Sequence, residues 1–84
     1  MKMRIKAFAI FDVKAKSYGQ PFFAPHNGVA LRMFSDLVED KNSSVSRHAE
    51  DYKLYLVGEW DDQEGIFICL EIPEFLANAV DFIK

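Results

Sequence analysis

Hydrophobic and polar residues alternate along the first segment of the chain, from Met3 to Lys14. One set of alternate positions is apolar throughout, whereas the other is charged at both ends and apolar at Phe8 and Ile10. A period of two over this length predicts a long β-strand. Because a strand face exposed to water needs no apolar centre, we expect another element to cover Phe8 and Ile10.

A loop and then an amphipathic helix are expected to follow. Residues 15–25 contain glycine and two prolines, which is typical of a loop. Asn27 stands where a helix N-cap would, since its side-chain oxygen can accept a hydrogen bond from the first helical turn. Apolar residues then recur at helical spacing with polar residues opposite, which predicts a helix from Asn27 to about Asp40. The apolar positions are Ala30, Met33, Phe34, Leu37 and Val38.

The second half of the chain predicts a β-hairpin and a terminal helix. A capping cluster at residues 42–44 suggests one short turn before the next strand. Alternation returns over residues 52–60 and again over 66–72, and the five residues between them end in Gly65, as in a hairpin. Pro73 is expected to end the second strand. Residues 74–84 show apolar positions in helical register, with acidic residues first and Lys84 last.

These elements predict a single α+β domain over residues 1–84. The expected order is β-α-β-β-α, with a three-stranded sheet, one main helix packed on one face, and a possible C-terminal helix. The other face would carry its own apolar set, so it needs the C-terminal helix or a second subunit to cover it. Its members are Phe8, Ile10, Tyr55, Val57, Phe67 and Cys69. A homodimer through that face is one hypothesis.

Composition narrows the class of protein. The 84 residues are 50% hydrophobic, which is typical of a folded domain. A formal net charge of −3 argues against coating nucleic acid by bulk electrostatics, although basic residues crowd the first segment. A lone cysteine, Cys69, excludes an intramolecular disulfide, and its apolar neighbours suggest that it is buried. The sequence shows neither a membrane-spanning stretch nor a secretory signal, so we expect a cytoplasmic protein.

Few residues suggest reaction chemistry. His48 precedes Glu50 and Asp51, but chain neighbours rarely aim at one point, so a surface role is favoured over a metal or catalytic one. The acidic run at residues 59–65 lacks the spacing of a calcium loop and is expected to be a solvated turn. We therefore expect no enzyme, no catalytic residue, no metal and no cofactor.

The basic first strand is the one constellation that suggests a function. Arg4, Lys6 and Lys14 would project from one face with Phe8 between them, and such a face can follow a phosphate backbone and stack a base. The alternative is a solvated edge whose lysines deter strand pairing. Other aromatic residues could add stacking surface or could belong to the core.

Several segments together resemble a known family. They are residues 10–15, residues 21–25 with 27–32, His48 followed by residues 50–52, and residues 58–62 with Gly65. In their order and spacing, these segments resemble the small nonstructural protein of gokushovirus-type microviruses. These viruses are phages with small circular single-stranded DNA genomes. The resemblance covers about residues 5 to 70. The resemblance implies a protein that is absent from the virion and acts in the bacterial cytoplasm. By analogy with related phages, it implies a protein that switches viral replication from double-stranded DNA to the synthesis of single-stranded DNA, which is coupled to packaging.

Two hypotheses of function remain open. The first is a protein linked to DNA replication that contacts phosphates through basic residues. These are Arg4, Lys6, Lys14, Lys16 and Arg32. The second is an interaction module that binds a phage or host replication or assembly factor through aromatic residues, without touching DNA. These are Phe8, Phe22, Phe23, Tyr55 and Trp60. The expected partners are single-stranded DNA, phage or host replication proteins and a second copy of the chain, with no membrane.

Overall fold

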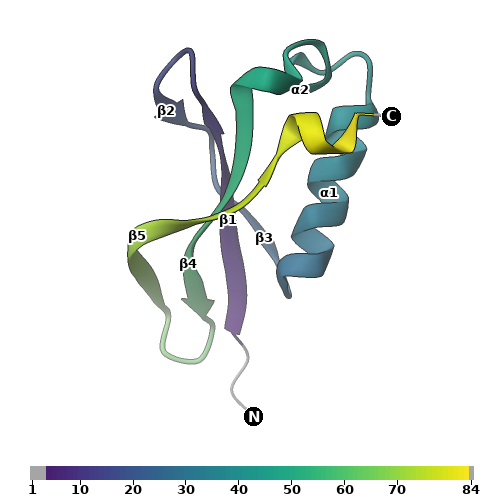
Figure 1. Cartoon of the computed structure of the whole chain (residues 1–84). Helices are drawn as coiled ribbons and strands as arrows, with labels where there is room; N and C mark the ends of the chain where they lie inside the picture. The colour runs from purple at the N-terminus through teal and green to yellow at the C-terminus, as the bar shows by residue number, and fades with distance from the viewer. Residues whose placement is uncertain (1–3, 84) are drawn as a thin grey trace.

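In the computed structural model, which describes residues 4–83, five antiparallel strands form one curled sheet, and the helix α1 packs against one of its faces (Figure 1). The strands are β1 (Arg4–Asp12), β2 (Ser17–Tyr18), β3 (Phe22–Ala24), β4 (Tyr52–Asp61) and β5 (Ile66–Asn78). The α-helices are α1 (Asn27–Glu39) and the short α2 (Ser44–Arg47). Two 3-10 helices follow, η1 (Ala49–Asp51) and η2 (Ala79–Phe82).

Strand β1 lies inside the sheet and pairs along both edges. One edge pairs with β4, from Arg4 opposite Asp61 to Asp12 opposite Tyr52. The other edge is shared, because β3 pairs with residues 6–8 and β2 with residues 11–12. Strand β5 lies beyond β4. The prediction of an α+β domain with a three-stranded sheet is therefore wrong: the structure is mostly β, and the expected loop of residues 15–25 contributes two further strands.

The C-terminal segment is a strand where the sequence predicted a helix. Glu74 pairs with Leu56 and Asn78 with Lys53, and only the single turn of η2 follows. Residues 70–73 separate these pairs from Cys69, which pairs with Gly58, so they form a bulge opposite Val57. Pro73 lies in this bulge, where its missing N–H removes no hydrogen bond of the ladder, so it does not end the strand. The predicted end at Lys84 lies outside the described residues.

The core lies between α1 and one face of the sheet. Phe8 and Leu54 from the sheet and Phe34 from α1 are fully buried there. The predicted apolar stripe of α1 is confirmed at Ala30, Phe34 and Val38, whereas Met33 lies at the rim with 42% of its surface exposed. Phe8 is covered by an element, as its position on the mixed face of β1 predicted.

The helix caps confirm one prediction and correct another. Ser43 caps α2, since its hydroxyl oxygen accepts a hydrogen bond from the Ser46 N–H at 3.1 Å. Asn27 is the first residue of α1, and His26 stands at the N-cap without a side-chain cap bond. The Asn27 side chain instead accepts a hydrogen bond from Lys6 Nζ at 3.4 Å, which ties β1 to the start of the helix.

Asp61 organises the turn between β4 and β5. Its side chain is 1% exposed, and Oδ1 accepts hydrogen bonds from the backbone N–H groups of Gln63 at 3.0 Å and Glu64 at 3.1 Å. Its Oδ2 lies 3.7 Å from Arg4 Nε on the neighbouring strand. The run of carboxylates thus forms a hairpin turn, as the sequence predicted.

Replacing Asp61 by alanine is expected to destabilise the domain by about 1 to 2 kcal/mol, because both turn N–H groups lose a charged acceptor. Asp61→Asn keeps an acceptor at the same place and should cost less. Urea unfolding followed by circular dichroism gives both values. Equal losses for the two variants would show that the turn hydrogen bonds contribute nothing.

Candidate functional site: the open aromatic face

The sheet face opposite α1 carries two clusters of aromatic rings, and we call it the open face. Register fixes its members, because directly paired residues point to the same face. Ile5, Ala7, Ala9 and Phe11 of β1 pair with residues of the neighbouring strands, which therefore share that face. On β5, Phe67 pairs with Trp60 and Phe75 pairs with Tyr55, so both belong to the open face as well. The aromatic members are therefore Phe11, Tyr18, Phe23, Tyr55, Trp60, Phe67 and Phe75.

The first cluster is built around Tyr55. Its ring lies 6.2 Å from Phe11, 5.5 Å from Tyr18 and 5.7 Å from Phe75, and the Phe11 and Tyr18 rings are 4.8 Å apart. Lys53 adds a positive charge, since its Nζ lies 5.9 Å from the centre of the Phe75 ring, within the range of a cation–π contact. Tyr18 is 45% and Phe75 49% exposed, so both rings can be reached from solvent. We call these four rings and Lys53 the Tyr55 cluster.

The second cluster lies nearer the hairpin turn. Phe67 is 5.8 Å from Phe23 and 5.9 Å from Trp60 between ring centres. With Ile5 these rings line an apolar hollow of about 480 Å³. Small residues separate the two clusters, since Ala7 and Gly58 pair across the middle of the face. The lining of the hollow contains no charged residue, which sets it apart from the Tyr55 cluster.

The predicted phosphate-binding residues do not come together. Arg4 lies near two carboxylates, 3.5 Å from Glu59 and 3.7 Å from Asp61, and Lys6 donates to Asn27 beside α1. Arg32 lies on α1, on the other side of the sheet from the rings. Lys14 and Lys16 are exposed in the turn that leads into β2 and hence to Tyr18. Of the five, only these two lie next to an aromatic cluster.

The predicted aromatic surface is divided between the two faces. Phe8 and Phe22 stack at 5.8 Å on the α1 side, where Phe8 is fully buried, so both contribute to the core. Phe23, Tyr55 and Trp60 lie on the open face.

The apolar set predicted for the uncovered face is divided as well. Phe8 pairs with Leu56 and Ile10 with Leu54, which places all four on the α1 side, whereas Tyr55, Phe67 and Cys69 belong to the open face. The physical cause is a bulge at Val57: Ala7 pairs with Gly58 but Phe8 with Leu56, which reverses the alternation along β4. The same bulge brings Trp60 to the face of Tyr55.

Sequence reasoning missed Phe11, Phe75 and Lys53 as members of the site. The sequence predicts a helix over residues 74–84, and a helix does not pair Phe75 with Tyr55 as the strand does. Cys69 is exposed, which corrects the expectation that it is buried.

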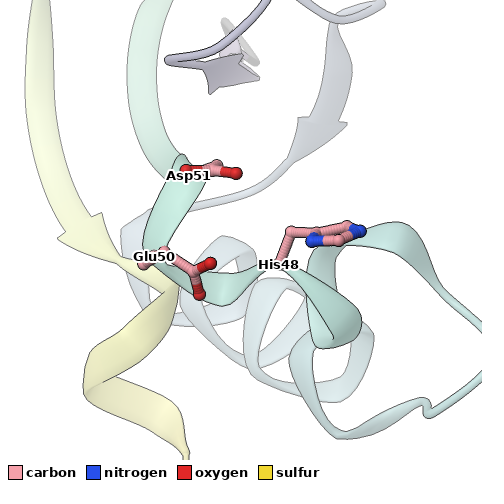
Figure 2. Close-up of side chains that lie close together, drawn as sticks. All are labelled: His48, Glu50 and Asp51. Atoms are coloured by element: carbon pink, nitrogen blue, oxygen red, sulfur yellow. The ribbon is translucent and has the colours of Figure 1, made fainter.

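His48, Glu50 and Asp51 lie close together at the turn of η1, as Figure 2 shows. One ligand atom from each residue lies within 4.8 Å of the others, so chain neighbours do converge here, contrary to expectation. His48 and Glu50 are exposed and Asp51 is half-buried. Because exposed carboxylates next to a histidine are common without a bound ion, the geometry alone assigns no metal.

Comparison with known families identifies the kind of protein. A family model described as Phage ORF5 protein matches residues 5–82, nearly the whole chain. The chain belongs to the phage ORF5 protein family. This confirms the phage origin implied by the resemblance, while the narrower likeness to gokushovirus-type microviruses stays a prediction. Searches of curated proteins and of solved structures found no match to this ORF5-family protein.

Within residues 4–83 of this ORF5-family protein, each helix is too short or too polar to cross a membrane.

Proposed function

We propose that this ORF5-family protein is a non-enzymatic, nonstructural phage protein that acts in replication or packaging of a single-stranded DNA genome in the host cytoplasm. We further propose that its open face binds the single-stranded DNA. The observation that carries the proposal is the Tyr55 cluster: four contacting rings beside a lysine, on a sheet face that α1 leaves uncovered.

Stacking is the first contribution to binding. Single-stranded bases expose both ring faces, and aromatic side chains on a sheet stack with them at about 1–3 kcal/mol per base. Tyr18 and Phe75 are about half exposed, so each has ring surface available without any change of fold. Tyr55 lies between them and holds both rings in place through its own contacts.

Phosphate contact is the second contribution. Lys53 lies in the Tyr55 cluster, and Lys14 and Lys16 occupy the turn next to Tyr18. If all three neutralise phosphates, the logarithm of affinity should fall with the logarithm of salt concentration at a slope of about −2. Binding would thus be modest and sensitive to salt, in keeping with a net charge of −3. The resemblance to a microvirus protein supports a single-stranded genome as the source of the ligand.

The test is fluorescence anisotropy of a labelled oligothymidylate titrated with the full chain, between about 20 and 200 mM salt. We expect Tyr18→Ala and Phe75→Ala each to lower affinity at least about fivefold, the equivalent of one weak stacking contact. Lys53→Gln should weaken binding and make the salt slope shallower by about 0.7.

Arg32→Gln is the matched control, because it removes one positive charge from the opposite side of the sheet. It should leave both the affinity and the salt slope unchanged. Equal effects of Lys53→Gln and Arg32→Gln would mean that binding follows overall charge and not this face. Absence of binding by the wild-type chain at the lowest salt concentration would exclude direct contact with DNA.

The apolar hollow favours a second candidate function, a module that binds a phage or host replication or assembly protein. Its lining of Ile5, Phe23, Trp60 and Phe67 offers apolar surface without a cation for phosphate. Under this alternative, Phe23→Ala should abolish co-purification with a defined phage replication protein, while Tyr18→Ala should not. The opposite order of effects would favour the Tyr55 cluster.

A further inference from the structure

The outer edge of β5 carries an uncharged run at residues 66–70, which is exposed apart from the half-buried Ile68. β5 is the last strand of the sheet, and among the described strands it pairs with β4 alone. Ile66 is 51%, Phe67 44% and Leu70 38% exposed. Natural sheets protect such edges with charges, proline or a covering element. Here Glu71 and Pro73 come only after the run, so its backbone is available for pairing.

The run lies at the end of the molecule farthest from α2 and η2. Figure 1 shows the hairpin of β4 and β5 projecting at that end, and the domain measures 40 × 23 × 18 Å along its principal axes. A partner can therefore approach the β5 edge without meeting α1.

We infer that residues 66–70 of β5 pair antiparallel with the same residues of a second copy of the chain, about a two-fold axis at Ile68. Such an isologous contact closes into a dimer and joins two five-stranded sheets into one. The inference concerns the β5 edge and goes beyond the proposed function, which concerns the Tyr55 cluster.

Self-complementarity identifies a second copy as the occupant and fixes the register. Only pairing about Ile68 matches all five uncharged residues with one another: Ile66 with Leu70, Phe67 with Cys69, and Ile68 with itself. Over residues 65–71, which are the run and one residue on each side of it, it sets Glu71 opposite Gly65, so no like charges face each other there. A shift to an axis at Cys69 would set Phe67 opposite Glu71.

This register also aligns the open faces of the two copies. Directly opposite residues in an antiparallel pair point to the same face, so Phe67 of each copy lies beside Cys69 of the other on one continuous face. The two apolar hollows then become neighbours across the axis, and the second copy covers part of Phe67.

The first test changes the residue on the axis. The wild-type chain should be a dimer by sedimentation equilibrium at micromolar concentration. Ile68→Lys and Ile68→Glu each place two like charges opposite one another, and each should raise the dimer dissociation constant more than about tenfold. An equimolar mixture of the two variants should restore the dimer, because lysine then faces glutamate. Circular dichroism confirms that each variant is folded.

The restored mixture separates loss of the interface from loss of the fold, since misfolded variants would not rescue one another. A monomeric wild-type chain would overturn the inference. So would a dimer that persists in both variants, because it would have to form through another surface.

Cys69 provides a second test of the register. Pairing about Ile68 makes the two Cys69 residues diagonal neighbours on one face, with Cα atoms about 8 Å apart. This is too far for a disulfide but within reach of a short bis-maleimide, which should link the wild-type chain into covalent dimers. Cys69→Ser should not be linked, and neither should Cys69→Ser with Asp36→Cys, which moves the thiol to α1. A dimer that resists linking at Cys69 would contradict this register.

The two proposals can fail separately. Ile68 lies outside the Tyr55 cluster, so a folded Ile68→Lys monomer that still binds single-stranded DNA would support the proposed function. Loss of DNA binding in Tyr18→Ala with an intact dimer would leave the edge contact standing.

Discussion

Phe8→Ala is expected to lower the free energy of unfolding by about 3 to 5 kcal/mol, the usual cost of emptying a fully buried phenylalanine site. Phe8 has no exposed surface, stacks on Phe22 and pairs with Leu56 in the main hydrophobic cluster. A domain of 84 residues has a small core and a total stability of only about 5 to 15 kcal/mol. The substitution should therefore leave a substantial fraction of the chain unfolded at 37 °C.

Phe23→Ala is the matched control, since it removes the same kind of ring from the open face. Phe23 lies on β3 opposite Ala7, the residue before Phe8. Phe23 is 43% exposed, so its loss should cost much less than that of Phe8. Urea unfolding monitored by circular dichroism measures both. Similar losses would mean that the open face is as well packed as the core, which would contradict its assignment as a binding surface.

The same pair of variants separates the two roles considered for Phe8. The sequence suggested that Phe8 stacks on a base on a strand face shared with Arg4, Lys6 and Lys14. In the structure Phe8 lies on the α1 side, so any loss of DNA binding in Phe8→Ala should follow the unfolded fraction. Phe75→Ala should instead reduce binding by the folded protein.

Local periodicity was sufficient to predict the elements that form a continuous pattern. β1, α1 and β4 lie close to their predicted positions, and β5 begins where it was predicted to begin, because each repeats its apolar residues over at least two turns or several strand positions. β2 and β3 contain only two and three residues, too few for a period to show. They form because β1 offers a free edge, which is a property of the tertiary structure.

The site was harder to predict than the fold, because one residue decides which side chains share a face. A strand slip of one position reverses every side chain, and the bulge at Val57 does this in the middle of β4. Without it, Trp60 would lie on the face of Leu56. Strict alternation therefore predicts that Phe8 shares a face with Tyr55 and that Trp60 lies on the other face. Because residues 74–84 were predicted to be a helix, Phe75 was not expected on the sheet at all.

Gly58→Ala is expected to cost about 3 kcal/mol, at the upper end of the range for overpacking. Gly58 lies in β4 opposite Cys69, and a Cβ added there would approach the backbone oxygen of Ile68 to 2.6 Å. The obstructing atom belongs to the main chain of β5, which cannot turn aside as a flexible side chain could. The two strands would have to separate, and hydrogen bonds of the hairpin would be lost.

Gly19→Ala is the matched substitution, because the nearest atom to its added Cβ, the Ile10 oxygen, is 3.6 Å away, an ordinary contact. It should be neutral or stabilise by up to about 1 kcal/mol, since alanine restricts the unfolded chain. Urea unfolding gives the difference between the two variants, and equal values would refute the close approach at Gly58. Because β5 also carries the proposed dimer edge, Gly58→Ala should weaken self-association as well, whereas Gly19→Ala should leave it intact.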